Sequence, residues 1–383
     1  MLENWFQKYN KLTEYIMLHP EIKISERVVR IPETVRDQFN QLLWDTREEY
    51  VKERDKDILD RTEELINNYQ ELAGDTIKTL KLDDIDTFPD IREFLRNPVE
   101  KIVKELRNAL MELLKGRISF AQYEEEAMNI FMATYQKYYQ RVYELWLTLS
   151  LVKLLEADKL FRVDTEQFDQ EDFWEHGGGG QAKVPEPDQT QVLSFKHNTE
   201  IGILVADQII HSAKLNCYFS FKPHVRQPLG RAIERSKERE WFPLPKETLK
   251  IMDRNVFLVY KSKKIEDLNF IADNESICRP DLIIECVGEE KALNSNYLNR
   301  AKIYTQVFKP EYGTYVVSKE PILEGKQADG STQIESEKIS DRVADLVKNN
   351  IRLLPIGLSI QGLVPIIDLF VEKINNEQST DSL

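Results

Sequence analysis

Apolar residues recur at helical spacing through roughly the first 130 residues of the chain. The clearest pattern runs from Trp44 to Leu72, where an apolar residue returns every seven positions. A coiled coil would need a second apolar seam, but Arg54, Arg61 and Asn68 occupy its positions. The pattern therefore favours an ordinary amphipathic helix packed on neighbouring helices.

Two further helices are expected before the pattern changes. Residues 99–115 show the spacing of an amphipathic helix. A longer helix is expected over residues 120–158, and its second half, from Val142 to Leu155, is apolar on nearly all sides. A helix that is apolar all round is buried in a core. Glu144 is the only acidic residue in this apolar half.

Beyond the long helix the apolar runs become short and β-like. They lie near residues 161, 192, 217, 256, 281 and 314, with helices expected near 293–308 and 336–349 and a last strand–helix pair near 351–374. This order predicts an α/β domain with a central mixed sheet flanked by helices. We expect a helical N-terminal domain over 1–130 and the α/β domain over 131–383.

A polar segment at 163–190 interrupts the expected α/β domain. It holds an acidic run and then four consecutive glycines, at 177–180. The glycines lack the Lys-Ser/Thr of a phosphate-binding P-loop and the spacing of a dinucleotide-binding fold. The segment is therefore expected to form a flexible surface loop.

The chain of 383 residues carries a net charge of −14, which opposes a large basic footprint for nucleic acid. Any contact with nucleic acid must therefore be confined to a local basic segment. Residues 225–241, which hold five basic side chains, are the candidate for such a segment. The same stretch is also compatible with a solvent-exposed amphipathic helix in which glutamates alternate with the basic residues. The three cysteines lack metal-type spacing and indicate a reducing compartment. No run approaches the roughly 18 apolar residues of a membrane span, so we expect a cytoplasmic protein without membrane contact.

The stretch ICRPDLIIECVG, residues 277–288, places two carboxylates in an apolar run. An ionised Glu285 inside a buried strand is costly unless it is paired or holds a cation. The alternatives are that the strand ends at Ile284 and leaves Glu285 in solvent, or that Arg279 or Arg300 pairs with it.

RPDLIIEC, followed by AKIYTQVFKPEYGTYVVS, resembles the PD-(D/E)xK, or restriction-endonuclease-like, nuclease superfamily. The closer likeness is to its Uma2-like and restriction-associated branch, over roughly residues 135–320. RVYELW, at 141–146, is similar to the first core helix of restriction-associated members, which often carries an acidic residue. The resemblance implies a restriction-endonuclease-like core behind an all-helical N-terminal region.

The resemblance implies a Mg²⁺ or Mn²⁺ ion held by Asp281 and Glu285, with Glu144 as an auxiliary acid. A divalent ion can polarise a phosphodiester and lower the pKa of a bound water. The motif lysine is replaced by Val287, so Lys302 of the next helix is the candidate for its role.

Strand geometry limits how the two motif acids can act together. Four residues of straight strand place Asp281 and Glu285 about 13 Å apart. Either the strand bends near Asp281, or Asp253 from a neighbouring strand pairs with Glu285.

Two functions follow. The first is a metal-dependent nuclease that cuts nucleic acid, with DNA favoured over RNA by the resemblance, in restriction or anti-phage defence. Its N-terminal helices would recognise a protein partner, the substrate or another copy of the chain. The second is a catalytically inactive nuclease-fold protein that acts as an interaction or assembly subunit. Val287 and the net charge of −14 favour this second interpretation.

Overall fold

The structure is a computed structural model. It describes residues 3–163, 182–183, 191–195, 208–221, 256–261, 280–287, 309–319 and 346–368, and helical residues at 298, 301–302, 304–306, 344 and 371–372. The chain forms two compact units: a helical unit, residues 1–68 and 88–143, and a sheet unit, residues 69–87 and 144–383. This division differs from the expected boundary near 130 in two respects. It falls within the long helix, between 143 and 144, and residues 69–87 group with the sheet.

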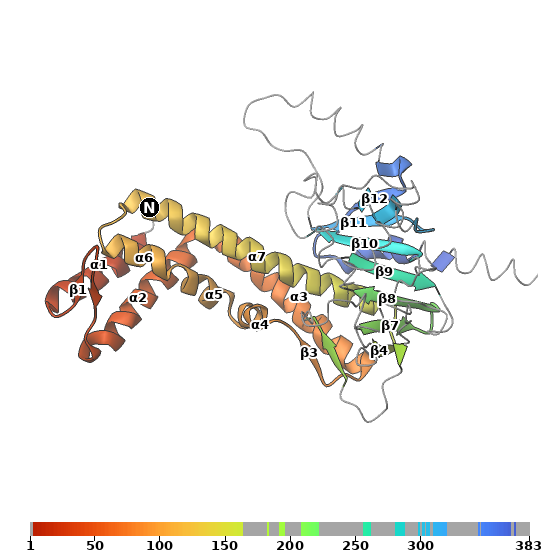
Figure 1. Ribbon diagram of the computed structural model, residues 1–383, viewed down its shortest axis with the longest axis horizontal. Helices are drawn as coiled ribbons and strands as arrows, with labels where there is room; N and C mark the ends of the chain where they lie inside the picture. Colours follow the sequence, from red (N-terminus) through yellow and green to blue (C-terminus); the bar gives the residue numbers. More distant parts are fainter. Residues whose placement is uncertain are drawn as a thin grey trace, which may run out of the picture. The chain divides into compact units, whose positions relative to one another are not determined.

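Seven helices and one hairpin account for the chain up to residue 154, apart from a short strand at 84–86 (Figure 1). They are α1 (Glu3–Leu18), β1 (Lys23–Ile24), β2 (Val29–Arg30), α2 (Glu33–Arg54), α3 (Lys56–Leu80), α4 (Pro89–Arg96), α5 (Pro98–Glu105), α6 (Arg107–Leu114) and α7 (Phe120–Leu154). None of these described helices is long and apolar enough to span a bilayer.

The expectation of one continuous helix from Trp44 to Leu72 is wrong, because the helix is interrupted at Asp55. Asp55 adopts extended backbone, with φ −154° and ψ 92°. Its Oδ1 accepts a hydrogen bond from the Ile58 N–H at 3.1 Å, which caps the start of α3. An aspartate side chain can bond to a nearby backbone N–H instead of allowing the helix to continue.

The expected helix over 99–115 is likewise two helices. Asn97 caps α5, accepting the Glu100 N–H on Oδ1 at 3.0 Å, and α5 ends at Glu105. Leu106 separates it from α6, which runs to Leu114. The apolar spacing is the same on both sides of the break, so the pattern alone does not reveal it.

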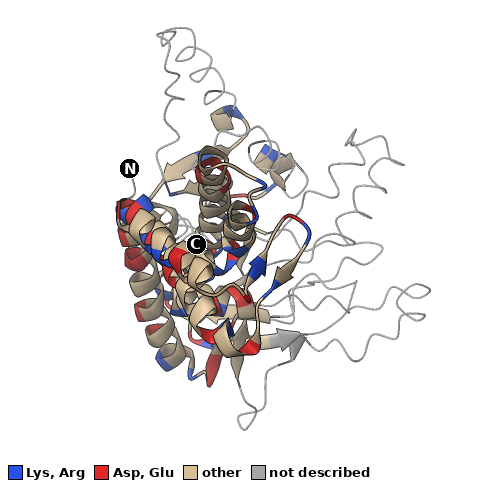
Figure 2. Cartoon of the chain, turned by 90° about the vertical axis from the view of Figure 1, so that its left-hand side faces the viewer, with Lys and Arg blue, Asp and Glu red and all other residues tan. Residues whose placement is uncertain are grey.

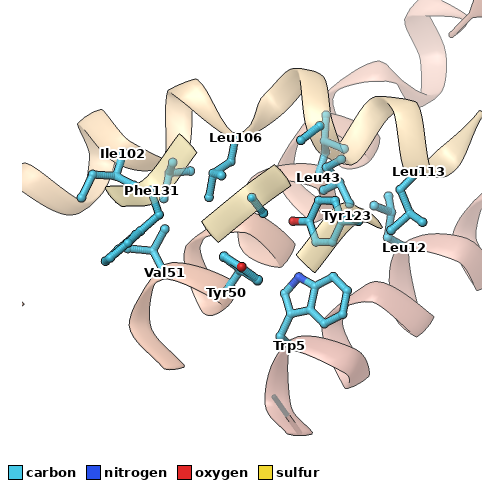
Figure 3. Close-up of a cluster of buried hydrophobic side chains, with 14 of the residues drawn as sticks. Trp5, Leu12, Leu43, Tyr50, Val51, Ile102, Leu106, Leu113, Tyr123 and Phe131 are labelled. Carbon is cyan, nitrogen blue, oxygen red and sulfur yellow. The ribbon is translucent and has the colours of Figure 1, made fainter. Parts of the chain in front are cut away.

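An aromatic cluster joins three helices in the core of the helical unit (Figure 3). Trp5 of α1 stacks on Tyr123 of α7, with ring centroids 5.3 Å apart, and meets Tyr50 of α2 edge-on at 5.9 Å. The Glu53 carboxylate accepts the backbone N–H groups of Asn4 and Trp5 at 3.0 and 2.9 Å. It thereby caps the first turn of α1 and holds Trp5 against the core.

A buried guanidinium ties α2 to α5. Arg47 Nε donates to the Leu43 carbonyl and Nη1 to the Val103 carbonyl, both at 2.9 Å. Val103 belongs to the last turn of α5, where carbonyls lack helical partners and the helix dipole is negative. Burial, together with the nearby charge of Arg107, lowers the pKa of Arg47 to about 10. Arg47 thus completes the C-terminus of α5.

The long helix α7 begins as expected, at Phe120. Ser119 and Gln122 form a capping box: Ser119 Oγ accepts the Gln122 N–H at 3.3 Å, and Gln122 Oε1 accepts the Ser119 N–H at 2.8 Å. This reciprocal pair fixes where the helix starts.

The same helix ends four residues before the expected Asp158. Glu156 has a positive φ of 47°, and the Ala157 N–H donates to the Val152 carbonyl at 3.1 Å. This geometry is a Schellman-type end, which glycine normally provides. Without a glycine there, the sequence offers no stop signal.

A mixed sheet organises the sheet unit. Its strands are β4 (Lys159–Val163), β5 (Ala182–Lys183), β7 (Gln208–Ser212), β8 (Cys217–Phe221), β9 (Val256–Lys261), β10 (Leu282–Val287), β11 (Thr314–Ser318) and β12 (Ile351–Pro355). They follow the order β12-β11-β10-β9-β8-β7-β4-β5. From β5 to β10 neighbours are antiparallel, and from β10 to β12 they are parallel (Figure 1).

A second, small parallel pair joins β3 (Asp84–Asp86) to β6 (Val192–Ser194). The run near residue 192 is therefore a strand, as expected, but it lies outside the large sheet. β7 and β3 were not anticipated. The remaining expected strands are confirmed.

Helical residues cover the parallel half of the sheet. Leu298 and Ala301 pack with Val316 of β11, Leu346 and Ile351 in one buried cluster. Crossover helices of this kind are how parallel strands are joined and covered. The prediction of an α/β fold with a mixed sheet and flanking helices is confirmed at this level.

Replacing Arg47 with alanine is expected to lower the free energy of unfolding of the helical unit by roughly 2–4 kcal/mol, because two buried carbonyls lose a charged donor. Urea denaturation followed by far-UV circular dichroism measures this loss. Arg61→Ala, at an exposed position of α3, is the control and should stay within about 0.5 kcal/mol of the wild type. Equal losses in both variants would contradict the role of Arg47.

Candidate functional site

The centre of the sheet holds a carboxylate. Glu285 lies in β10, paired with Val256 of β9 on one side and Val316 of β11 on the other. Its side chain is 0% exposed. The alternative in which the strand ends at Ile284 and leaves Glu285 in solvent is therefore wrong. Apolar β-branched neighbours and pairing on both sides draw the whole strand inside.

Glu144 belongs to the same sheet unit. It stands where α7 enters this unit and is 9% exposed. The pKa of the Cys286 thiol is raised well above its ordinary value, first by burial, then by the charge of Glu144, then by that of Glu285. Two carboxylates separated by more than a hundred residues in sequence thus both act electrostatically on one buried sulfur atom.

Two buried carboxylates in one unit can be stabilised in only a few ways. Two anions withdrawn from water repel each other and lose hydration. A divalent cation, a basic side chain or a shared proton can offset both costs. Hard carboxylate oxygens are the ligands that Mg²⁺ and Mn²⁺ prefer. Glu144 and Glu285 each carry oxygen donors of this chemical type.

The Cys286 thiol does not supply a nucleophile. Cys286 is 0% exposed, and its raised pKa keeps it protonated near neutral pH. The chemistry available at this point is therefore that of the carboxylates.

Asp281 has a different environment, just ahead of β10. Its Oδ2 accepts the Lys261 N–H at 2.5 Å, and its backbone bonds to Val259 and Tyr312 at 2.8 Å each. Asp281 thereby closes the end of β9 and fixes the turn before β11. Burial raises its pKa; the hydrogen bond from Lys261 opposes this rise, and the charge of Glu311 adds to it.

The register separates the two motif acids. Leu282 pairs with Val259, and Glu285 pairs with Val256, so Asp281 lies beyond one end of this pairing and Glu285 at the other. Four strand residues span about 13 Å, which is too far for one ion to contact both carboxylates. The pairing therefore separates Asp281 from Glu285 along the strand, while Glu144 acts on Cys286, the residue next to Glu285.

Lys302 follows Ala301 in the helix that covers β11. Leu298, Ala301 and Thr305 form the buried side of this helix, and Lys302 is half-buried beside it. Thr305 Oγ1 is 2.7 Å from both the Ala301 carbonyl and Thr314 Oγ1, which fixes the helix on the sheet. Lys302 is therefore carried by a firmly attached element.

Within the part of the chain that the structure describes, no group of three or more His, Cys, Asp or Glu side chains could hold a metal ion. Several sequence candidates lie outside the described residues: Asp253, Arg279, Arg300, the side chain of Val287, the basic stretch 225–241 and most of the segment 163–190.

Sequence reasoning does not single out Lys261, whose contact with Asp281 depends on the register of two strands. The signal for Glu144 and Glu285 was present in the sequence. Each is an acidic residue inside an otherwise apolar run.

Comparison with family models, with curated proteins and with solved structures finds no match for this chain. The resemblance to the PD-(D/E)xK superfamily therefore remains a prediction based on the motifs.

The raised pKa of Asp281 has a consequence for stability. The folded state retains the proton to a higher pH than the unfolded state does, so the wild type loses stability as pH rises from about 4 through the folded pKa. Asp281→Asn cannot ionise and still offers an oxygen to the Lys261 N–H. We expect it to melt a few degrees above the wild type at pH 7, with the difference shrinking towards pH 4.

Melting temperatures across this pH range test the expectation. Asp60→Asn, at an exposed position of α3, controls for the loss of a charge. A variant at Asp281 that is less stable than the wild type at pH 7 would show that the ionised carboxylate is favoured by its surroundings.

Proposed function

We propose that the protein is a metal-dependent nuclease in which Glu285 and Glu144 hold the catalytic ion. The observation that supports the proposal is that Glu285 of β10 and Glu144 of α7 both raise the pKa of the buried Cys286 thiol. In this proposal Asp281 does not bind the ion, and its Oδ2 accepts the Lys261 N–H at the end of β9.

In this proposal the two glutamates fix the ion through hard oxygen donors and exclude bulk water on the side of the sheet. The bound divalent ion would supply Lewis acidity to a phosphodiester and a water of lowered pKa. Attack of that water on phosphorus would break the bond to the leaving oxygen, which would take up a proton from solvent. Lys302 is the candidate to stabilise the added negative charge, since ammonium groups serve as point charges for phosphate.

DNA is the proposed substrate class, with restriction or defence against foreign DNA as the proposed setting. Both rest on the resemblance to restriction-associated nucleases. We propose a cytoplasmic location on the same basis and on the sparse cysteines.

Cleavage of supercoiled plasmid in Mg²⁺ or Mn²⁺ tests the assignment. We expect Glu285→Gln and Glu144→Gln to slow cleavage at least about a hundredfold, because each removes a ligand while keeping the side-chain shape. Chelation by EDTA should abolish cleavage by the wild type. Thermal unfolding of both variants provides the check on folding.

Asp281→Asn separates this arrangement from the one that the motif implies. If Glu144 and Glu285 hold the ion, the variant should cleave within about tenfold of the wild type. If Asp281→Asn slows cleavage as much as Glu285→Gln does, Asp281 is a ligand of the ion, as the motif implies. Cleavage that is unaffected by Glu285→Gln would contradict the nuclease assignment.

A second candidate is a catalytically inactive assembly subunit. It is favoured by one observation: the described residues contain no cluster of three metal-ligating side chains. Under this alternative the wild type cleaves no plasmid with either ion, and the Glu144–Glu285 pair is a structural element that shares a proton. Titration with Mn²⁺ followed by electron paramagnetic resonance would then detect no binding that depends on Glu285.

A further inference from the structure

The β1–β2 hairpin connects α1 to α2 in the helical unit and is fixed at its base (Figure 1). Ile22, Ile24 and Ile31 pack with the core of this unit. Arg117, in the segment before α7, donates from Nη2 to the Glu26 carbonyl in the turn of the hairpin. These contacts hold the hairpin in one orientation against the helices.

One face of the hairpin points entirely to solvent. Lys23 pairs with Arg30 and Ile24 with Val29, and the Ser25 N–H donates to the Val28 carbonyl at 2.9 Å. Side chains alternate across a strand, so Lys23, Ser25, Val28 and Arg30 share the face opposite Ile24. All four are exposed, whereas Ile24 packs inwards.

The composition of this outer face is unusual for the molecule. Two cations lie directly opposite each other, although like charges in that position destabilise a hairpin. Beside them Val28 leaves 51% of its surface exposed. Arg27 adds a third cation in the turn, and Glu26 is the only acid between positions 23 and 30.

The rest of the helical unit does not share this pattern. Acidic and basic residues are interspersed along its helices (Figure 2), and the whole chain carries a net charge of −14. An outer face with Lys23 and Arg30 opposite each other, and with Glu26 as the one acid of the hairpin, is therefore a local feature. An anionic partner would offset the repulsion between Lys23 and Arg30.

We propose that the outer face of the β1–β2 hairpin is a contact surface for the sugar–phosphate backbone of double-stranded DNA. The choice of duplex DNA rests on the proposed nuclease function. A two-stranded ribbon fits the major groove, which is about 12 Å wide. Lys23, Arg27 and Arg30 would then face phosphates, while Val28 contacts sugars or base methyl groups.

A second copy of the chain is the competing occupant, and the hairpin is poorly suited to it. Each strand has two residues, which offer too few backbone groups for stable strand addition. Two copies would also bring identical cations together at a two-fold contact.

The test measures binding of the full chain to a fluorescein-labelled duplex of about two helical turns. Anisotropy is recorded in EDTA, so that no cleavage occurs, at several salt concentrations. Lys23→Ala/Arg30→Ala is expected to weaken binding tenfold or more and to lower the slope of log K against log salt by about two, one for each phosphate that is no longer neutralised. Val28→Ser should weaken binding without changing this slope.

Lys56→Ala/Arg61→Ala is the matched control. It removes the same two side-chain types from exposed positions of α3 that make no ion pair among the described residues. It should bind within about twofold of the wild type. Circular dichroism of every variant confirms that the helices are intact.

Equal weakening by the two double variants, or no binding by the wild type, would overturn the proposal. A changed mass in sedimentation for Lys23→Ala/Arg30→Ala, with unchanged DNA binding, would identify an interface between copies and overturn it as well. The proposed nuclease function can fail independently of the hairpin proposal. DNA binding that depends on the hairpin, without any plasmid cleavage, would reject the nuclease function and support the hairpin as a DNA contact surface. Cleavage that depends on Glu285, together with DNA binding that does not depend on the hairpin, would support the nuclease function and reject the hairpin as the contact surface.

Discussion

The constraint on which the sheet unit depends is the burial of the Glu285 carboxylate in the middle of a sheet. Strand β10 is paired on both sides, so the side chain cannot reach water by fraying of an edge. Its charge must be balanced from above or below the sheet. The charge of Glu144 acts on the neighbouring Cys286 thiol and adds a second negative charge to this part of the sheet unit. The folded position of α7 and the chemistry of the sheet are therefore linked through one small group of atoms.

Much of the architecture could be predicted from the sequence, because apolar spacing directly reflects burial. The strands at 217–221, 256–261, 282–287 and 314–318 lie where short apolar runs indicated them. The start of α7 at Phe120 also coincides with the expectation, and a capping box fixes it chemically. Glu144 and Glu285 could be selected as candidates for the same reason: a charge inside an apolar run is costly wherever the run is buried.

Other features depend on interactions that a linear pattern does not contain. The break at Asp55 arises from a side-chain cap on a helix whose apolar spacing continues through it. The end of α7 depends on a positive φ at Glu156, a residue type that rarely adopts it. Strand geometry identified the distance between Asp281 and Glu285 as a difficulty for a shared ion. The bond from Lys261 to Asp281, by contrast, follows from register, which is set by pairing across the sheet.

The parallel pair formed by β3 and β6 has a consequence for how the chain is made. The backbone of Gln191 bonds to the side chain of Asp83 across 108 positions of sequence. At synthesis rates of roughly 5–20 residues per second, β3 emerges from the ribosome about 5–20 s before its partner strand. During this interval its edge is unpaired and open to other chains. Of its three residues, two are aspartates, and their mutual repulsion between nascent copies protects the waiting strand from premature association.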